Sequence, residues 1–198
     1  MSIKNPNHPA KGSRITVEPI RNLGHIKSIK KLIMDNPRNY LLFVLGINNG
    51  LRAGDLLKLK VRDVKNLRPG QSIAIRESKT GKNNILMINK TAYKALQIFL
   101  EGAGIDNGEY LFASRKTKKP LTIQSVNALV KKWTGEINLS GNYGAHTLRK
   151  TFGYIQRTEF GVGFEVLAKR FNHTSPAVTM RYLGLTSNEV NEFLMNEI

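Results

Sequence analysis

His146-Thr-Leu-Arg149-Lys-Thr-Phe-Gly-Tyr154 carries an imidazole and a guanidinium three residues apart. On a helix, this spacing places the two side chains on one face, and we expect a helix over residues 146–159. A single histidine at a helix start is more often a capping or packed residue than a functional one. The meaning of this stretch therefore depends on the segments around it.

Four further segments supply side chains of related chemistry. Gly50-Leu-Arg52-Ala-Gly-Asp55 places an arginine after a helix-ending glycine, with an acid three residues on. Ser78-Lys79-Thr-Gly81 places a lysine in an expected turn between two strands. His173 comes later, and Tyr182 follows it by nine residues.

Each segment also has an ordinary structural explanation. Arg52 could be a surface charge that pairs with Asp55. Lys79 could belong to a basic hairpin turn, and it lacks the glycine spacing of a phosphate-binding loop. Tyr182 lies at helical spacing from Val178, as a core residue would. The order and spacing of all five segments together favour a functional interpretation.

Brought together, these side chains suit the chemistry of a phosphodiester. Arginine offers planar, permanently charged forks that match phosphate oxygens, and histidine and lysine can donate protons. A tyrosine can attack phosphorus once its phenol is deprotonated, and it then forms a covalent ester. Such charges can replace a metal ion. With four histidines, no cysteine and no His-Glu-x-x-His motif, the supply of zinc ligands is poor, and we expect no metal site.

The ordered segments resemble the catalytic domain of the tyrosine recombinases. Residues 47–60 and 146–154 are especially similar to small bacterial and phage integrases, and the resemblance covers roughly residues 20 to 185. Asn172 stands before His173 where glycine is the commoner family residue. Many relatives carry an N-terminal helical core-binding domain, and here only a basic arm stands in its place. The chain is either a short, single-domain member or a trimmed piece of a longer protein.

The resemblance implies a role for each residue. Tyr182 would attack the scissile phosphate and form a 3′-phosphotyrosyl link, while Lys79 would protonate the departing 5′ oxygen. Asp55 would support the region of Arg52 and His146 without touching the phosphate. His146 would also help to shuttle the tyrosine proton. Binding of the phosphate oxygens and stabilisation of the transition state would fall to four residues: Arg52, His146, Arg149 and His173.

The implied activity is site-specific recombination of double-stranded DNA without a cofactor. The implied assembly is a homo-oligomer on DNA, a tetramer when two sites are paired, and a monomer when free, with accessory DNA-bending proteins as candidate partners. Two alternatives stay open. One is relaxation of DNA by chemistry like that of type IB topoisomerases, and the other is a catalytically silent DNA-binding regulator.

The charge balance agrees with a nucleic-acid partner. The chain has 31 Lys and Arg against 14 Asp and Glu, a net charge of +17, and lysines and arginines that neutralise phosphates release counterions. Further candidates for DNA contact are basic residues in the turn, the first expected helix, a loop and the helix of His146: Lys82, Lys27, Lys30, Lys31, Arg115 and Lys150.

Hydrophobic periodicity predicts a mainly α fold with a small antiparallel β-sheet. We expect strands over residues 71–76 and 84–88. We expect a flexible basic arm over residues 1–14, a catalytic domain over 15–185 and an amphipathic helix within 186–198 that is exchanged between protomers. Helices are expected at 26–33, 37–49, 52–60, 91–100, 123–137, 146–159, 163–171, 176–183 and 187–197.

The sequence has no cysteine, and its longest apolar stretch, Tyr40–Ile47, is far shorter than the roughly 20 residues of a membrane-spanning helix. Its first residues lack the apolar core of a signal peptide. We therefore expect an intracellular protein with no membrane partner. The resemblance to bacterial and phage integrases implies the bacterial cytoplasm or nucleoid, or a phage-encoded protein.

Overall fold

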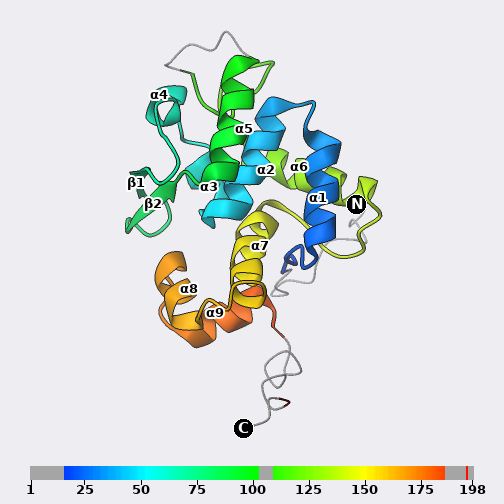
Figure 1. The fold of residues 1–198 in the computed structure, drawn as a ribbon, viewed down its shortest axis with the longest axis vertical. Coiled ribbons are helices and arrows are strands. Elements are labelled where there is room, and N and C mark those ends of the chain that lie inside the picture. Colours follow the sequence, from blue (N-terminus) through cyan, green and yellow to red (C-terminus); the bar gives the residue numbers. More distant parts are fainter. Residues whose placement is uncertain (1–15, 103–108, 186–194, 196–198) are drawn as a thin grey trace, which may run out of the picture.

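Helices make up most of the chain in the computed structural model, which describes residues 16–102, 109–185 and Met195 (Figure 1). The elements in chain order are α1 (Leu23–Ile33), α2 (Pro37–Asn49), α3 (Ala53–Leu56), α4 (Val61–Val64), β1 (Ser72–Arg76), β2 (Asn83–Met87), α5 (Lys90–Glu101), α6 (Ile123–Glu136), α7 (Ala145–Thr158), α8 (Phe164–Phe171) and α9 (Pro176–Leu183). The predicted fold class, mainly α with a small antiparallel sheet, is confirmed. The expected N-terminal arm and the expected helix at 187–197 lie outside the described residues.

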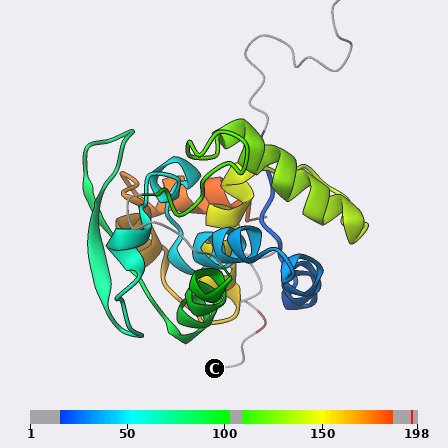
Figure 2. The same cartoon turned by 90° about the horizontal axis from the view of Figure 1, so that it is seen from above.

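Helix α2 forms the centre of the helical body. Its side chains from Leu41 to Leu45 are all buried, as expected for a helix that is covered on every side. Helices α1, α5 and α7 pack against it, and a view from above shows them around it (Figure 2). Among the described residues, no helix is both long enough and apolar enough to cross a membrane.

Gly50 ends α2 and determines where the chain goes next. It adopts a left-handed φ of 58° and donates its N–H to the Gly46 carbonyl, the usual way for a glycine to end a helix. A Cβ at this position would overlap the ring of Phe152 on α7. A glycine is therefore required on two grounds, and Arg52 stands two residues later, at the N-cap of α3.

The expected helix over residues 52–60 is wrong in its second half. Helix α3 ends at Leu56, and a separate short helix, α4, follows. Between them the backbone pairs with another segment: the Leu59 carbonyl accepts from Leu111 N at 2.8 Å, and Val61 N donates to the Glu109 carbonyl at 3.0 Å. These bonds use groups that a continuous helix would need internally.

Strands β1 and β2 pair antiparallel, in a register that sets Ser72 opposite Met87 and Arg76 opposite Asn83. The tight turn between them holds Lys79, and the predicted strand–turn–strand is confirmed. In both views the hairpin lies at the edge of the helical body, on the side of α2 away from α1 (Figures 1 and 2).

Helices α7, α8 and α9 meet at Gly153 of α7. Phe171 of α8 and Leu183 of α9 are fully buried there in a small core of their own. A Cβ on Gly153 would lie 2.7 Å from both the Phe171 ring and a Leu183 methyl group. The missing side chain thus allows α8 and α9 to dock closely on α7.

We predict that Gly153→Ala lowers the free energy of unfolding by about 1–3 kcal/mol, because the added methyl overpacks this contact. Gly135→Ala on α6 is the matched control, since nothing lies within 4 Å of its Cβ position. That control should be neutral or stabilising by up to about 1 kcal/mol. Urea unfolding of both variants checks this, and equal stabilities of the two variants would contradict it.

Candidate active site

Arg149 joins three parts of the fold. It is only 2% exposed, and its guanidinium donates from Nη1 to the Gly50 carbonyl and from Nη2 to the Phe171 carbonyl, each at 2.7 Å. Its Cζ also lies 4.6 Å from the centre of the Phe171 ring. Burial lowers the pKa of Arg149 to about 10, so the residue stays cationic at neutral pH.

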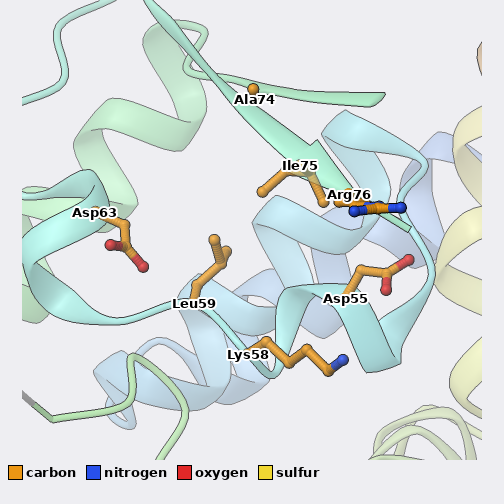
Figure 3. Close-up of a pocket in the computed structure, with 7 residues that line it drawn as sticks. All are labelled: Asp55, Lys58, Leu59, Asp63, Ala74, Ile75 and Arg76. Carbon is orange, nitrogen blue, oxygen red and sulfur yellow. The ribbon is translucent and has the colours of Figure 1, made fainter. Parts of the chain in front are cut away.

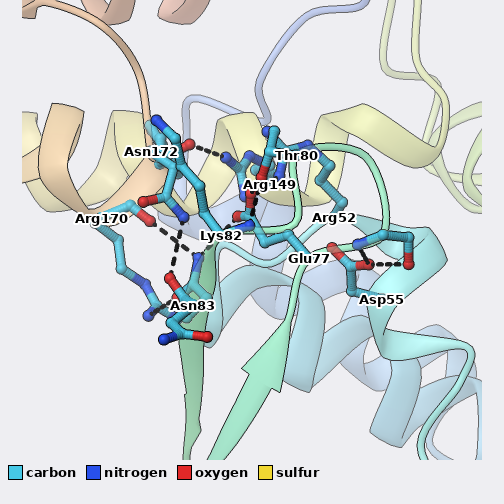
Figure 4. Close-up of polar contacts among 12 residues, drawn as sticks. Arg52, Asp55, Glu77, Thr80, Lys82, Asn83, Arg149, Arg170 and Asn172 are labelled. Carbon is cyan, nitrogen blue, oxygen red and sulfur yellow. Dashed lines mark hydrogen bonds and ion pairs between the residues drawn. The ribbon is translucent and has the colours of Figure 1, made fainter.

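Arg52 lies next to an acid. Its Nη1 contacts Oε2 of Glu77 at 2.5 Å, and its side chain keeps 18% exposure whereas that of Glu77 has none (Figure 4). Burial alone would raise the pKa of Glu77, but hydrogen bonds from Thr80, Asn84 and Arg52 outweigh it and hold the pKa at about 2. Glu77 is therefore a permanent anion inside a cationic site.

Asp55 holds the turn that carries Lys79. Its Oδ1 accepts from Ser78 N at 2.9 Å and from Ser78 Oγ at 2.7 Å. This acid, near the end of α3, thus points to the hairpin, and Glu77 contacts Arg52 (Figure 4). That Asp55 supports the region of Arg52 and His146 stays a prediction.

Tyr182 is docked on aromatic and cationic neighbours. Its ring lies 5.1 Å from His173 and 5.6 Å from Phe171, both edge to face, and Lys150 Nζ lies 5.1 Å from its centre. Its hydroxyl is buried with no hydrogen bond of good geometry among the described residues. Burial raises the pKa of Tyr182 to about 12, although the charges of Arg149 and Arg52 oppose this. The phenol is thus neutral as it stands.

Two histidines complete the cluster. His173 Nδ1 lies 2.9 Å from Thr179 Oγ1, and burial, followed by the charges of Arg149 and Arg52, lowers its pKa to about 4. His146 is more exposed, but partial desolvation lowers its pKa as well, helped by the charges of Arg149, Arg52 and Lys79. Both imidazoles are neutral at pH 7, and the charge effects on His146 place it near the two arginines and Lys79.

A model described as the phage integrase family matches residues 16–189 of the chain. The chain belongs to this family. The probable integrase/recombinase YoeC of Bacillus subtilis is 37% identical over 172 residues, which cover 85% of this chain and 90% of YoeC. Tyrosine recombinase XerA of Pyrococcus horikoshii is 30% identical over 168 residues, or 83% of this chain and 57% of XerA. The chain thus spans most of YoeC but little more than half of XerA.

Solved structures share the fold of this integrase-family chain. A crystal structure of XerA recombinase aligns with a TM-score of 0.74 at 19% identity, over 94% of this chain and 68% of that one. A crystal structure of XerH bound to a palindromic difH substrate, in a post-cleavage complex, aligns with a TM-score of 0.69 at 19% identity. The alignment covers 91% of this chain and 53% of XerH. A lambda integrase dimer bound to a core site aligns with a TM-score of 0.65 at 20% identity. The alignment covers 96% of this chain and 53% of the lambda integrase chain. The predicted tyrosine recombinase catalytic-domain fold is confirmed.

Most of the other predicted DNA-contact residues lie on the surface of this integrase-family domain. Lys27, Lys31, Lys82 and Arg115 are exposed, and Lys30 is half-buried. Lys82 lies in the hairpin turn near the cluster. Helix α1, with three of these lysines, lies across the helical body from the hairpin (Figures 1 and 2).

Lys150, the remaining residue predicted to contact DNA, is buried in the structure. It is only 6% exposed, and its ammonium faces the Tyr182 ring. The reason is its place on α7, because the residue after Arg149 faces the docked α9 and the N-terminal segment rather than solvent. Its burial lowers its pKa.

Sequence reasoning missed two residues of the site, Glu77 and Arg170. Arg170 ties α8 to the hairpin and to the end of α2: it donates from Nε to the Asn49 carbonyl at 3.0 Å and from Nη1 to Asn84 Oδ1 at 2.6 Å. An acid directly before Ser78-Lys79 was visible in the sequence, but its partner Arg52 lies 25 residues away. Nothing in the local pattern pairs them.

A shallow pocket borders Asp55 (Figure 3). Its lining mixes acids, bases and apolar residues: Asp55, Lys58, Leu59, Asp63, Ala74, Ile75 and Arg76. None of the other site residues borders it. Among the described residues, no group of three or more His, Cys, Asp or Glu is placed to hold a metal ion.

We predict a pH dependence of stability from His173. Its folded pKa of about 4 lies below its ordinary 6.5, so the unfolded chain takes up a proton before the folded chain does. The stabilisation is complete above the unfolded pKa and is lost as the pH falls toward the folded one. From about pH 7 to about pH 5, the wild type should lose about 1–2 kcal/mol more unfolding free energy than His173→Gln. Urea titrations at both pH values measure this, and equal losses would refute it.

Proposed function

We propose that this chain is a site-specific DNA recombinase and that Tyr182 is its nucleophile. The observation that carries the proposal is the convergence of α3, the hairpin turn, α7, α8 and α9 on one cluster. That cluster contains two arginines, a turn lysine, two neutral histidines and a tyrosine hydroxyl. Its members come from five segments that lie far apart along the chain.

The chemistry follows from the groups present. The Tyr182 oxygen attacks phosphorus, and the bond from phosphorus to the 5′ oxygen breaks. Lys79 supplies the proton to that leaving oxygen, and His146 accepts the phenolic proton. The products are a 3′-phosphotyrosyl ester and a 5′-hydroxyl, and the reverse attack by a 5′-hydroxyl of another duplex completes strand exchange.

Arg52 and Arg149 stabilise the charge that develops on the phosphate oxygens in the transition state. Arg149 already spends two N–H groups on backbone carbonyls, so its orientation is set before DNA binds. This preorganisation lowers the cost of binding the transition state, since the guanidinium need not reorient. His173, held by Thr179, adds a neutral hydrogen-bond donor.

The docked position of Tyr182 is a ground state rather than a reacting one. Its hydroxyl is buried, and its pKa of about 12 keeps it protonated. A scissile phosphate reaches this oxygen only after α9 or its neighbours rearrange. This rearrangement would occur on assembly on DNA, with the tetramer and the exchanged C-terminal helix that the sequence predicts.

The DNA partner is supported by the net charge of +17 and by the DNA complexes among the structural neighbours. A DNA-relaxing enzyme and a silent regulator find no such support, because the relatives named above are recombinases or integrases. The tetramer, the accessory DNA-bending proteins and a place in the bacterial cytoplasm or nucleoid belong to this proposal as well.

Covalent trapping tests the nucleophile. Wild type and Tyr182→Phe are incubated with nicked duplexes from the ends of the host element, or from a randomised library, and are then denatured. We expect a protein–DNA adduct with a free 5′ end from the wild type alone, because only it carries the attacking oxygen. Sequencing the trapped DNA identifies the site. Tight binding by both proteins with no adduct would point to a regulator instead.

A second prediction concerns Lys79. Lys79→Ala should slow cleavage by about 10²–10⁴-fold if it removes the acid of the reaction. A bridging sulfur in place of the 5′ oxygen leaves without protonation, since thiols have a pKa near ~8.5, so this substrate should restore most of the rate. Lys82→Ala, from the same turn, is the control: it should change the cleavage rates of the oxygen and the sulfur substrate by the same factor. If Lys79→Ala cleaved both substrates with the same defect, Lys79 would not be the general acid.

A further inference from the structure

Glu77 is a buried anion for which the mechanism above has no direct use. It stands at the end of β1, with its backbone N–H donating to Lys82 O at 2.9 Å and its carbonyl accepting from Gly81 N at 2.9 Å. Its carboxylate is fully enclosed. A carboxylate beside a phosphate site repels the substrate, so its presence there needs a compensating reason.

Both oxygens of the carboxylate have partners, and one of them is shared. Oε1 accepts from Asn84 Nδ2 at 2.9 Å. Oε2 contacts Arg52 Nη1 at 2.5 Å and accepts from Thr80 Oγ1 at 2.6 Å (Figure 4). A single oxygen atom therefore links the arginine that faces the phosphate to the residue next to Lys79.

The turn is thereby held on both flanks of Lys79. Asp55 binds Ser78 on one side, and Glu77 binds Thr80 on the other. Lys79 itself is exposed. A long, flexible side chain serves as a proton donor only if its backbone is fixed within a few tenths of an ångström of the productive place.

Stability alone is a weak reason for this arrangement. The desolvation cost of a buried ion pair largely cancels its attraction, and apolar replacements are often as stable. A buried carboxylate, unlike an apolar residue, fixes the orientation of its partners, here the guanidinium of Arg52 and the hydroxyl of Thr80. Residues that orient metal ligands typically affect affinity or activity by about 10–100-fold, and we expect an effect of the same size for Glu77.

We infer that Glu77 is a positioning residue that holds Arg52 and the Lys79 turn in a fixed mutual geometry. The arginine that binds the phosphate and the lysine that protonates the leaving oxygen then act as one unit. This inference rests on the proposed function, since it assigns a purpose to Glu77 within that reaction.

The test compares three variants on two substrates. Glu77→Gln keeps the shape and removes the charge. Thr80→Val removes the hydrogen bond from Thr80 Oγ1 to Glu77, together with the longer one that Thr80 Oγ1 accepts from Lys82 N at 3.3 Å. Glu136→Gln, whose partner is Lys132 on the surface of α6, is the matched charge control. The substrates are nicked duplexes of the trapped site with either oxygen or sulfur at the bridging 5′ position. Single-turnover cleavage, DNA affinity and urea unfolding are measured for each.

On the oxygen substrate, Glu77→Gln should cleave about 10–100-fold more slowly than the wild type. Its DNA affinity should be equal or higher, because a negative charge has left the site. On the sulfur substrate the defect should shrink but persist, since the acid is no longer needed while Arg52 is still misplaced. Thr80→Val should be slow on oxygen and close to wild type on sulfur. Glu136→Gln should match the wild type on both.

Three results would overturn the inference. The first is cleavage by Glu77→Gln within about twofold of wild type, far below the loss expected for a supporting group. The second is the same defect on both substrates, and the third is a parallel loss of cleavage, affinity and stability. Thr80→Val keeps the test open if Glu77→Gln does not fold, since it leaves the carboxylate in place. A wild type that forms no Tyr182-dependent adduct would instead refute the proposed function.

Discussion

The buried guanidinium of Arg149 is the interaction on which the rest of the site depends. Its two hydrogen bonds to the carbonyls of Gly50 and Phe171 join the end of α2 to the end of α8 through α7. Arg52 follows the first of these carbonyls by two residues, and His173 follows the second by two. A buried charge is costly unless it is hydrogen-bonded, so the chain must bring both loop ends to this one side chain. The position of Arg52 and His173 beside Arg149 follows from that requirement.

Several cationic side chains lie close together in this site, and the folded protein must tolerate their repulsion when no anion is bound. Arg52, Arg149, Arg170 and Lys79 lie around the hairpin and α8, and their mutual repulsion opposes folding. Glu77 relieves part of it as an anion whose pKa of about 2 keeps it charged throughout the neutral range. Backbone carbonyls relieve more, since Arg149 and Arg170 both donate to them. Glu77 and the backbone carbonyls thus hold the cationic side chains in fixed directions. In the chemistry that we propose, these side chains act without a metal ion.

Tyr182, which we propose as the nucleophile, is held in its docked position by packing. The aromatic contacts of Tyr182 with Phe171 and His173, and the ammonium of Lys150 over its ring, stabilise the docked α9. Burial keeps the phenol neutral, and the nearby guanidinium groups lower the pKa only in part. Close packing at Gly153 gives the docked arrangement its precision. In the reaction that we propose, Tyr182 leaves this position only when binding of DNA offsets the lost contacts.

The sequence by itself determined most of the helices, the hairpin, the family and the identity of the main cluster, because periodicity, Gly50 and the ordered motifs are local properties of the chain. It did not determine the break between α3 and α4, which depends on backbone pairing with residues 109–111. Nor did it show that Asp55 serves the turn, that Glu77 serves Arg52, or that Lys150 is buried against Tyr182. Those facts arise from contacts between segments far apart in sequence. Only tertiary structure decides them, since a charged side chain pairs with whatever the packing of the backbone brings within its reach.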